Sequence, residues 1–177
     1  MEHKRYIGIR VKIPISLGNM RQILTIDIGF SYQVVPAPVK MTYPTLLDME
    51  EPVVIAYSSV SVIAEKFEAM IDLGEMNSRM KDFYDVWQLL ISGNIDKEDL
   101  KKAIEKTFKI RKTPLTKNHP LFQSDFALDP QRQKMWDAFV RRSKLVNAPA
   151  FPQVMDLIAN QLSGIYNYLL SQENHSE

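Results

Sequence analysis

Hydrophobic and polar positions change their period about one third of the way along the chain. Over residues 6–13 and again over 23–28, apolar and polar residues roughly alternate, which is the period of a half-buried strand. Gly18 and Asn19 between these stretches favour a tight turn, so an antiparallel hairpin is predicted. The prolines that recur between residues 34 and 52 predict an extended loop, because proline removes a backbone donor. One short strand can follow over residues 53–57.

From residue 58 onward the apolar residues recur at helical spacing. A helical hairpin is predicted first, with one helix over residues 59–73 and a second that Asn77 can cap and that runs to residue 91. The second helix should bury Ile91. The first should bury a stripe of apolar residues and place Glu68 on its polar side; the stripe consists of Val60, Ile63, Phe67, Met70 and Ile71. A third helix, which Asp96 and Asp99 should open, is predicted over residues 97–109, with an apolar stripe of Leu100, Ala103, Ile104 and Phe108. After a polar, proline-marked connection over 111–128, a fourth helix should begin at Asp129 and Pro130 and a fifth near Pro152.

Strands that come first and helices that follow predict an α+β fold with segregated elements. We expect a β-rich part with a small antiparallel sheet over residues 1–57 and a C-terminal helical domain of about five helices over residues 58–177. Two or three strands make a thin sheet, which is marginal without further strands or helices. This favours the expectation that the beginning of the domain is missing.

The composition excludes some classes of protein but does not identify a reaction. The 22 Lys and Arg residues nearly balance the 21 Asp and Glu residues, so no global field argues for a nucleic-acid partner. Cysteine is absent, which excludes disulfides and thiolate-bound zinc. No stretch is apolar enough for a signal peptide or a membrane span, and we expect a cytoplasmic protein with no membrane partner.

The first candidates for chemistry are three charged residues on the predicted helical hairpin: Lys66, Asp82 and Asp85. Lys66 interrupts an otherwise apolar row, so its ammonium either snorkels to water or needs an anion partner. Arg79, Asp82 and Asp85 recur at steps of three and should share one helix face. Paired carboxylates can bind a divalent cation or take a proton, and Lys66 with Arg79 can hold phosphate oxygens. The alternative is a solvated face with Arg79–Asp82 and Lys81–Asp85 pairs.

Several segments of the chain carry a family resemblance. The motifs YPTLL at 43–47, AEKFEAM at 64–70 and NSRMKDFYD at 77–85 resemble, in order and spacing, the signature of the AbiEii/AbiGii nucleotidyltransferase toxin family. TIDIGF at 25–30 and WDAFVRR at 136–142 are also similar to that family. The family belongs to the DNA polymerase β-like nucleotidyltransferases, so the resemblance implies a toxin of a prokaryotic toxin–antitoxin or abortive-infection (phage-defence) system.

The resemblance also implies roles for individual residues. Lys66, in AEKFEAM, and Asp82, in the KD pair, match functional positions of the transferase site, and Asp85 is a further catalytic candidate. Asp27, on the TIDIGF strand, is placed like a metal-site carboxylate. The implied reaction moves a nucleotide from a nucleoside triphosphate (NTP), with Mg²⁺, to an RNA acceptor such as tRNA or to a protein. A cognate antitoxin is the implied protein partner.

The sequence departs from the family pattern in one important respect. It contains no Gly-Gly or Gly-Ser turn for the nucleotide phosphates and no Asp-x-Asp pair for two magnesium ions. We therefore expect a truncated, weak or inactive transferase when the chain is alone. The alternative is a non-catalytic helical module that binds an antitoxin or a complementing N-terminal half. The basic residues between 101 and 117 favour either an RNA-binding surface or an ordinary solvated helix face.

Overall fold

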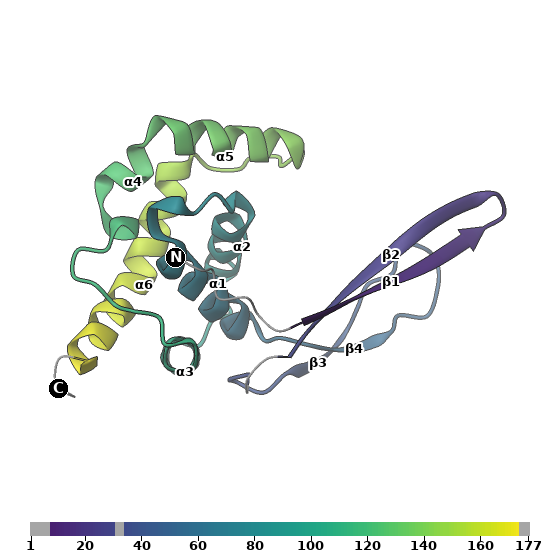
Figure 1. The fold of residues 1–177 in the computed structure, drawn as a ribbon, viewed down its shortest axis with the longest axis horizontal. Helices are drawn as coiled ribbons and strands as arrows, with labels where there is room; N and C mark the ends of the chain where they lie inside the picture. Colours follow the sequence, from purple (N-terminus) through teal and green to yellow (C-terminus); the bar gives the residue numbers. More distant parts are fainter. Residues whose placement is uncertain (1–7, 31–33, 174–177) are drawn as a thin grey trace. The chain divides into compact units, whose positions relative to one another are not determined.

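The computed structural model describes residues 8–30 and 34–173 (Figure 1). By its contacts the chain divides into two compact units, Met1–Val34 and Val35–Glu177. Two small antiparallel sheets precede a set of helices in the described residues, which confirms the predicted α+β class. The boundary predicted between residues 57 and 58 stays a prediction, because compactness does not show which segment folds independently.

The first unit is the predicted hairpin. Strands β1 (Gly8–Leu17) and β2 (Met20–Gly29) pair in antiparallel register, and Gly18 takes a φ of +58° at the turn. Residues 6 and 7 of the first predicted strand lie outside the described residues. Because side chains alternate between the two faces of a strand, the register gives the hairpin one polar and one aliphatic face. Apart from Gln22, which lies opposite Ile15, the aliphatic face comprises Ile9, Val11, Ile13, Ile15, Leu17, Met20, Leu24, Ile26 and Ile28.

The second sheet contains a strand that was not predicted. Strand β3 (Val39–Thr42) pairs with β4 (Val53–Ala56), so the prediction of a loop throughout residues 34–52 was wrong for β3. Pro38 and Pro44 flank β3 without entering it. The four residues of β3 therefore keep their backbone donors and can pair.

The first helix, α1 (Ser59–Leu73), has the predicted ends. The Ser58 hydroxyl oxygen accepts a hydrogen bond from the Ser61 N–H at its start. Gly74 at its end takes a φ of +49°, and its N–H donates to the Met70 carbonyl. Glycine tolerates this backbone region best because it has no Cβ.

The start of α2 (Met80–Ile91) lies later than predicted. A 3₁₀ turn, η1 (Gly74–Met76), follows α1, and Asn77 stands before the helix and is not its cap. The Asn77 side-chain oxygen instead accepts a hydrogen bond from the Arg79 N–H at 2.9 Å. This local turn satisfies the amide two residues on, which is the usual way in which asparagine shapes a loop.

The later helices follow their predicted caps. Asp96 caps α3 (Lys97–Arg111) by accepting from the Asp99 N–H, and Asp129 caps α5 (Pro130–Arg142) by accepting from the Arg132 N–H. The last helix is α6 (Phe151–Glu173). The predicted polar connection over 111–128 also contains η2 (Pro120–Phe122) and α4 (Ser124–Leu128), which are too short to show a period in the sequence.

The core of the second unit lies between the helices. Helix α1 packs against α2 and α3, and α2 packs against α5 and α6 (Figure 1). The predicted apolar stripes of α1 and α3 are buried, whereas Ile91, predicted to be buried, is 48% exposed because it ends α2. The largest buried side chains include Ile63, Phe67, Met70, Phe83, Ile104, Trp136, Phe151, Ile158, Leu162 and Tyr166.

Glu68 is a buried charge on α1, although its spacing had placed it on the polar side of that helix. Its side chain is 3% exposed and forms an ion pair with Arg111, at the end of α3, at 2.5 Å. The Thr113 hydroxyl donates to the other carboxylate oxygen. Arg111 also contacts the Glu65 carboxylate at 3.1 Å. These contacts fasten α1 to the end of α3 through groups that water reaches poorly.

His119 fastens the same helix to the loop before α4. Its Nε2 donates to the Ile71 carbonyl at 3.0 Å, while its Nδ1 accepts from the Leu121 N–H at 3.2 Å. This bonding pattern requires a neutral imidazole. Burial lowers the pKa of His119, and the hydrogen bond to Ile71 offsets this only in part.

We expect the stability of the folded chain to fall as the pH drops below about 6.5. Below that value the imidazole of the unfolded chain binds a proton, whereas the imidazole of the folded chain stays neutral. The free energy of unfolding is therefore highest above pH 6.5 and decreases as the pH falls towards the lowered pKa of the folded state. Urea unfolding at pH 7.5 and pH 5.5 measures the effect. His119→Gln should cost about 1–3 kcal/mol at pH 7.5 and reduce the loss on acidification. An unchanged loss in this variant would show that His119 is not the group responsible.

Helices that could cross a membrane are absent from the part of the chain that the structure describes.

Candidate active site

Helices α1 and α2 bring the three candidate charges of the hairpin into direct contact. The Lys66 ammonium donates a hydrogen bond to the Asp82 carboxylate and lies 3.0 Å from Asp85 Oδ2. The three side chains are 24%, 16% and 23% exposed, so the cluster lies at the edge of the core and keeps access to solvent. Of the two possibilities for Lys66, the structure therefore shows a lysine with anion partners.

The two carboxylates keep Lys66 charged. Burial disfavours the ammonium, but hydrogen bonds to Asp82 and Asp85 outweigh burial, and the pKa of Lys66 lies above its ordinary value. A permanently charged ammonium beside two acceptors suits the binding of phosphate oxygens, which can compete for its protons. It does not suit a role as a general base.

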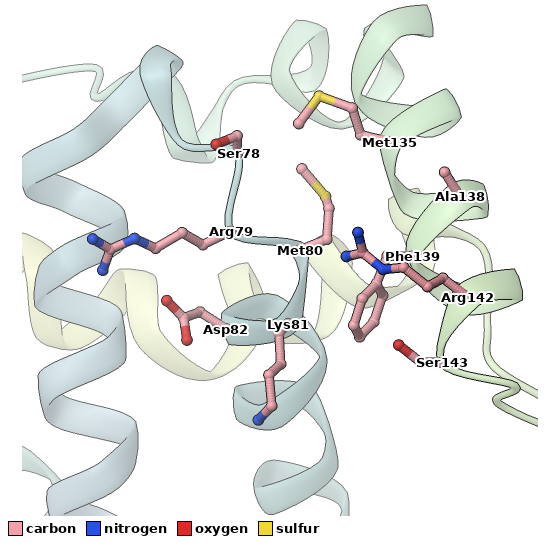
Figure 2. Close-up of a pocket in the computed structure, with 10 residues that line it drawn as sticks. All are labelled: Ser78, Arg79, Met80, Lys81, Asp82, Met135, Ala138, Phe139, Arg142 and Ser143. Carbon is pink, nitrogen blue, oxygen red and sulfur yellow. The ribbon is translucent and has the colours of Figure 1, made fainter. Parts of the chain in front are cut away.

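Of the two ion pairs expected on a solvated helix face, Arg79–Asp82 and Lys81–Asp85, only the second is present among the described residues. Lys81 binds Asp85 Oδ2 at 2.5 Å, as that alternative predicted, and it is 72% exposed. Arg79 does not pair with Asp82, and its guanidinium forms no ion pair with another residue that the structure describes. Figure 2 shows the Arg79 side chain extending beside Asp82 towards α1. Asp85 thus contacts two lysines, Lys66 and Lys81. The guanidinium N–H groups of Arg79 can bind a further acceptor.

A pocket of about 690 Å³ opens beside this cluster, between the start of α2 and the length of α5 (Figure 2). Asp82 lines one side of it, and Arg142 of α5 lines the other. Arg132 holds α5 near the loop before α2, since its guanidinium donates to the Asn77 carbonyl at 3.0 Å. No role was predicted for Arg142, although it stands in the WDAFVRR segment. The remaining lining residues are Ser78, Arg79, Met80, Lys81, Met135, Ala138, Phe139 and Ser143.

Asp27 lies on β2, in the first unit, and binds Arg10 across the hairpin. Arg10 donates to both carboxylate oxygens, at 2.6 and 2.9 Å, and these hydrogen bonds lower the pKa of Asp27. Within residues 8–30 and 34–173, no three His, Asp or Glu side chains gather as possible metal ligands. Asp27 is thus held by Arg10 on the hairpin, and its role as a metal ligand stays a prediction.

Part of the basic segment between residues 101 and 117 has partners within its own unit. Lys102 lies 3.8 Å from Asp99, and Lys101 lies 3.7 Å from the centre of the Tyr168 ring. Arg111 is held by Glu68. These contacts are those of an ordinary helix face. The exposed cations of the segment are Lys102, Lys109, Lys112 and Lys117, and Lys102 is the one of these four with an ion pair among the described residues.

Residues 1–157 match the family described as nucleotidyl transferase AbiEii toxin, type IV toxin–antitoxin system. The chain belongs to the AbiEii family. Comparison with curated proteins and with solved structures gives no match. As an AbiEii member, the chain is a nucleotidyltransferase-like toxin of a type IV toxin–antitoxin system, and the family implies a cognate antitoxin as partner. The match includes the helices that carry Lys66 and Asp82.

Proposed function

We propose that this chain transfers a nucleotide from an NTP to a hydroxyl group of an RNA, such as a tRNA, or of a protein. The observation that carries the proposal is the contact between Lys66 and Asp82, which come from different motifs and different helices. In a family of nucleotidyl transferases, a charged lysine beside a carboxylate supplies a phosphate ligand and a proton acceptor at one place.

In the proposed reaction, phosphate oxygens of the triphosphate take the ammonium of Lys66 and the guanidinium of Arg79 as partners. Asp82, released from its hydrogen bond with Lys66, then accepts the proton of the acceptor hydroxyl. The hydroxyl oxygen forms a bond to the α-phosphorus, the bond from that phosphorus to the β-phosphate oxygen breaks, and pyrophosphate leaves. Asp85, also bound to Lys66, keeps the ammonium in position.

Magnesium accompanies triphosphates in water and would neutralise charge on the leaving pyrophosphate. No three acidic or histidine side chains gather among the described residues, and no step of the proposed reaction is assigned to the metal. If Asp27 does bind magnesium, it must first exchange its contact with Arg10 for the metal.

The direct test incubates the purified chain with each α-³²P-labelled NTP, magnesium and either total RNA or a protein extract. We expect label to enter one of the two acceptor classes, and EDTA to abolish the transfer. Label in RNA would identify the hydroxyl as that of a ribose. Absence of both transfer and NTP binding would refute the proposal for this chain.

A second function is favoured by the absence of a Gly-Gly or Gly-Ser turn and of an Asp-x-Asp pair from the sequence. In this case the chain is a non-catalytic helical module that binds the antitoxin or a complementing N-terminal half. Copurification with the cognate antitoxin separates the two functions. Stable binding that Lys66→Met and Asp82→Asn leave unchanged, without any transfer, would favour the interaction module.

A further inference from the structure

The pocket between α2 and α5 has an excess of positive charge. Its acid, Asp82, is bound to Lys66, and its lysine, Lys81, is bound to Asp85. Arg79 and Arg142 form no ion pair with any side chain in the described part of the chain. Each of the two guanidinium groups is therefore uncompensated by an acid, and the one on the α5 side of the pocket, that of Arg142, can bind an anion such as a phosphate.

The two cations lie on either side of the first turn of α2. In Figure 2 the Arg79 side chain extends towards α1 beside Asp82, whereas Arg142 reaches from α5 past Phe139 towards α2. Arg142 is therefore the cation on the wall opposite the proposed catalytic carboxylate. An anion bound by Arg142 would lie in the same pocket that Asp82 lines.

The remaining lining suits a ligand with an apolar face. Met80, Met135 and Phe139 line the pocket between its charged walls; Met80 and Phe139 are only 4% and 8% exposed, and Met135 is the more exposed of the three. Methionine and aromatic side chains pack well against the flat face of a base. The volume of about 690 Å³ is also in the range of small-molecule sites. An inorganic anion would use the arginines alone, whereas a nucleotide uses both the charges and the apolar wall.

We propose that this pocket binds a nucleoside phosphate, with Arg142 as its phosphate ligand and the apolar wall as the surface for its base. The ligand is either the NTP or the terminal nucleotide of an RNA acceptor, which offer the same phosphate and base. This inference rests on the proposed function, since it places a substrate beside Asp82, and it adds Arg142 as a binding residue.

The test compares the full-length wild-type chain with Arg142→Met and with Arg141→Met, its neighbour on the same helix, which does not line the pocket. Calorimetry measures the affinity for each NTP with magnesium, and fluorescence anisotropy measures the affinity for a labelled single-stranded oligoribonucleotide. We expect Arg142→Met to weaken binding about 10- to 100-fold, as expected for loss of a charged hydrogen bond. Arg141→Met should bind like the wild type.

A loss confined to the triphosphates assigns the pocket to the donor, and a loss confined to the oligoribonucleotide assigns it to the acceptor. In the second case the salt dependence of binding should also weaken by about one unit of slope. Equal affinities of Arg142→Met and Arg141→Met for every ligand, or no binding of either ligand class by the wild type, would overturn the proposal.

The transfer assay separates this inference from the proposed function. Binding that depends on Arg142 in a chain that transfers nothing would refute the function and support the pocket. Transfer by Arg142→Met with unchanged KM for the NTP and for the acceptor would refute the pocket and leave the function standing. Both variants replace exposed arginines at the end of α5, so matching unfolding midpoints check that the fold is intact.

Discussion

Replacing Glu68 by Gln should lower the free energy of unfolding by about 3 kcal/mol, because it leaves the Arg111 guanidinium without its buried counter-charge. The Arg111 side chain is 15% exposed and cannot recover the loss by turning fully into water. Glu65 still contacts the guanidinium, so the cost should lie near the lower end of the range for broken buried pairs. Urea unfolding at pH 7.5 measures it.

Glu65→Gln is the matched control for this substitution. Glu65 binds the same guanidinium at 3.1 Å, but its side chain is 34% exposed, and exposed pairs contribute little. We expect this variant to lose less than about 1 kcal/mol. Equal losses in the two variants would show that burial of Glu68 does not govern the strength of its contact.

Lys66→Met should reduce the rate of nucleotide transfer about 100- to 1,000-fold, because it removes a charged group aimed at the phosphates. It also leaves Asp82 without a cation, so the unfolding midpoint should fall as well. Initial rates of label transfer, corrected for the folded fraction, separate the two effects. Lys66→Arg keeps the charge but not the compact ammonium, and it should retain part of the rate.

Lys97→Met, at the exposed start of α3, is the control for loss of a lysine. We expect it to retain the wild-type rate and midpoint. If Lys66→Met transfers nucleotide as fast as Lys97→Met, the contact between Lys66 and Asp82 is structural only.

The long helices could be predicted because each combines an apolar stripe with a capping residue. Asp96 and Asp129 cap the helices that they were predicted to start. Strand β3 could not be predicted in this way, because it is short and flanked by prolines. The same holds for α4, whose one buried residue, Phe126, gives no period. Local patterns thus predict elements that bury a long stripe and miss those that depend on a distant partner.

The candidate site shows the same limit. Spacing places Asp82 and Asp85 on one face of α2, but it does not say that this face meets Lys66 of α1; only the family motifs suggested their association. Glu68 was assigned to the polar side because it is charged. Its burial could not be foreseen, because its partner Arg111 lies 43 residues further along the chain. Arg142 received no role because its pocket forms only when α5 packs beside α2.

The central claim is that the pair Lys66–Asp82 performs chemistry, whereas the pair Glu68–Arg111 maintains the fold. The most direct test measures the rate of nucleotide transfer per folded molecule in Asp82→Asn and in Glu68→Gln. We predict that Asp82→Asn is folded and at least about 100-fold slower, and that Glu68→Gln is destabilised but transfers at the wild-type rate per folded molecule. A wild-type rate per folded molecule in Asp82→Asn would contradict the claim.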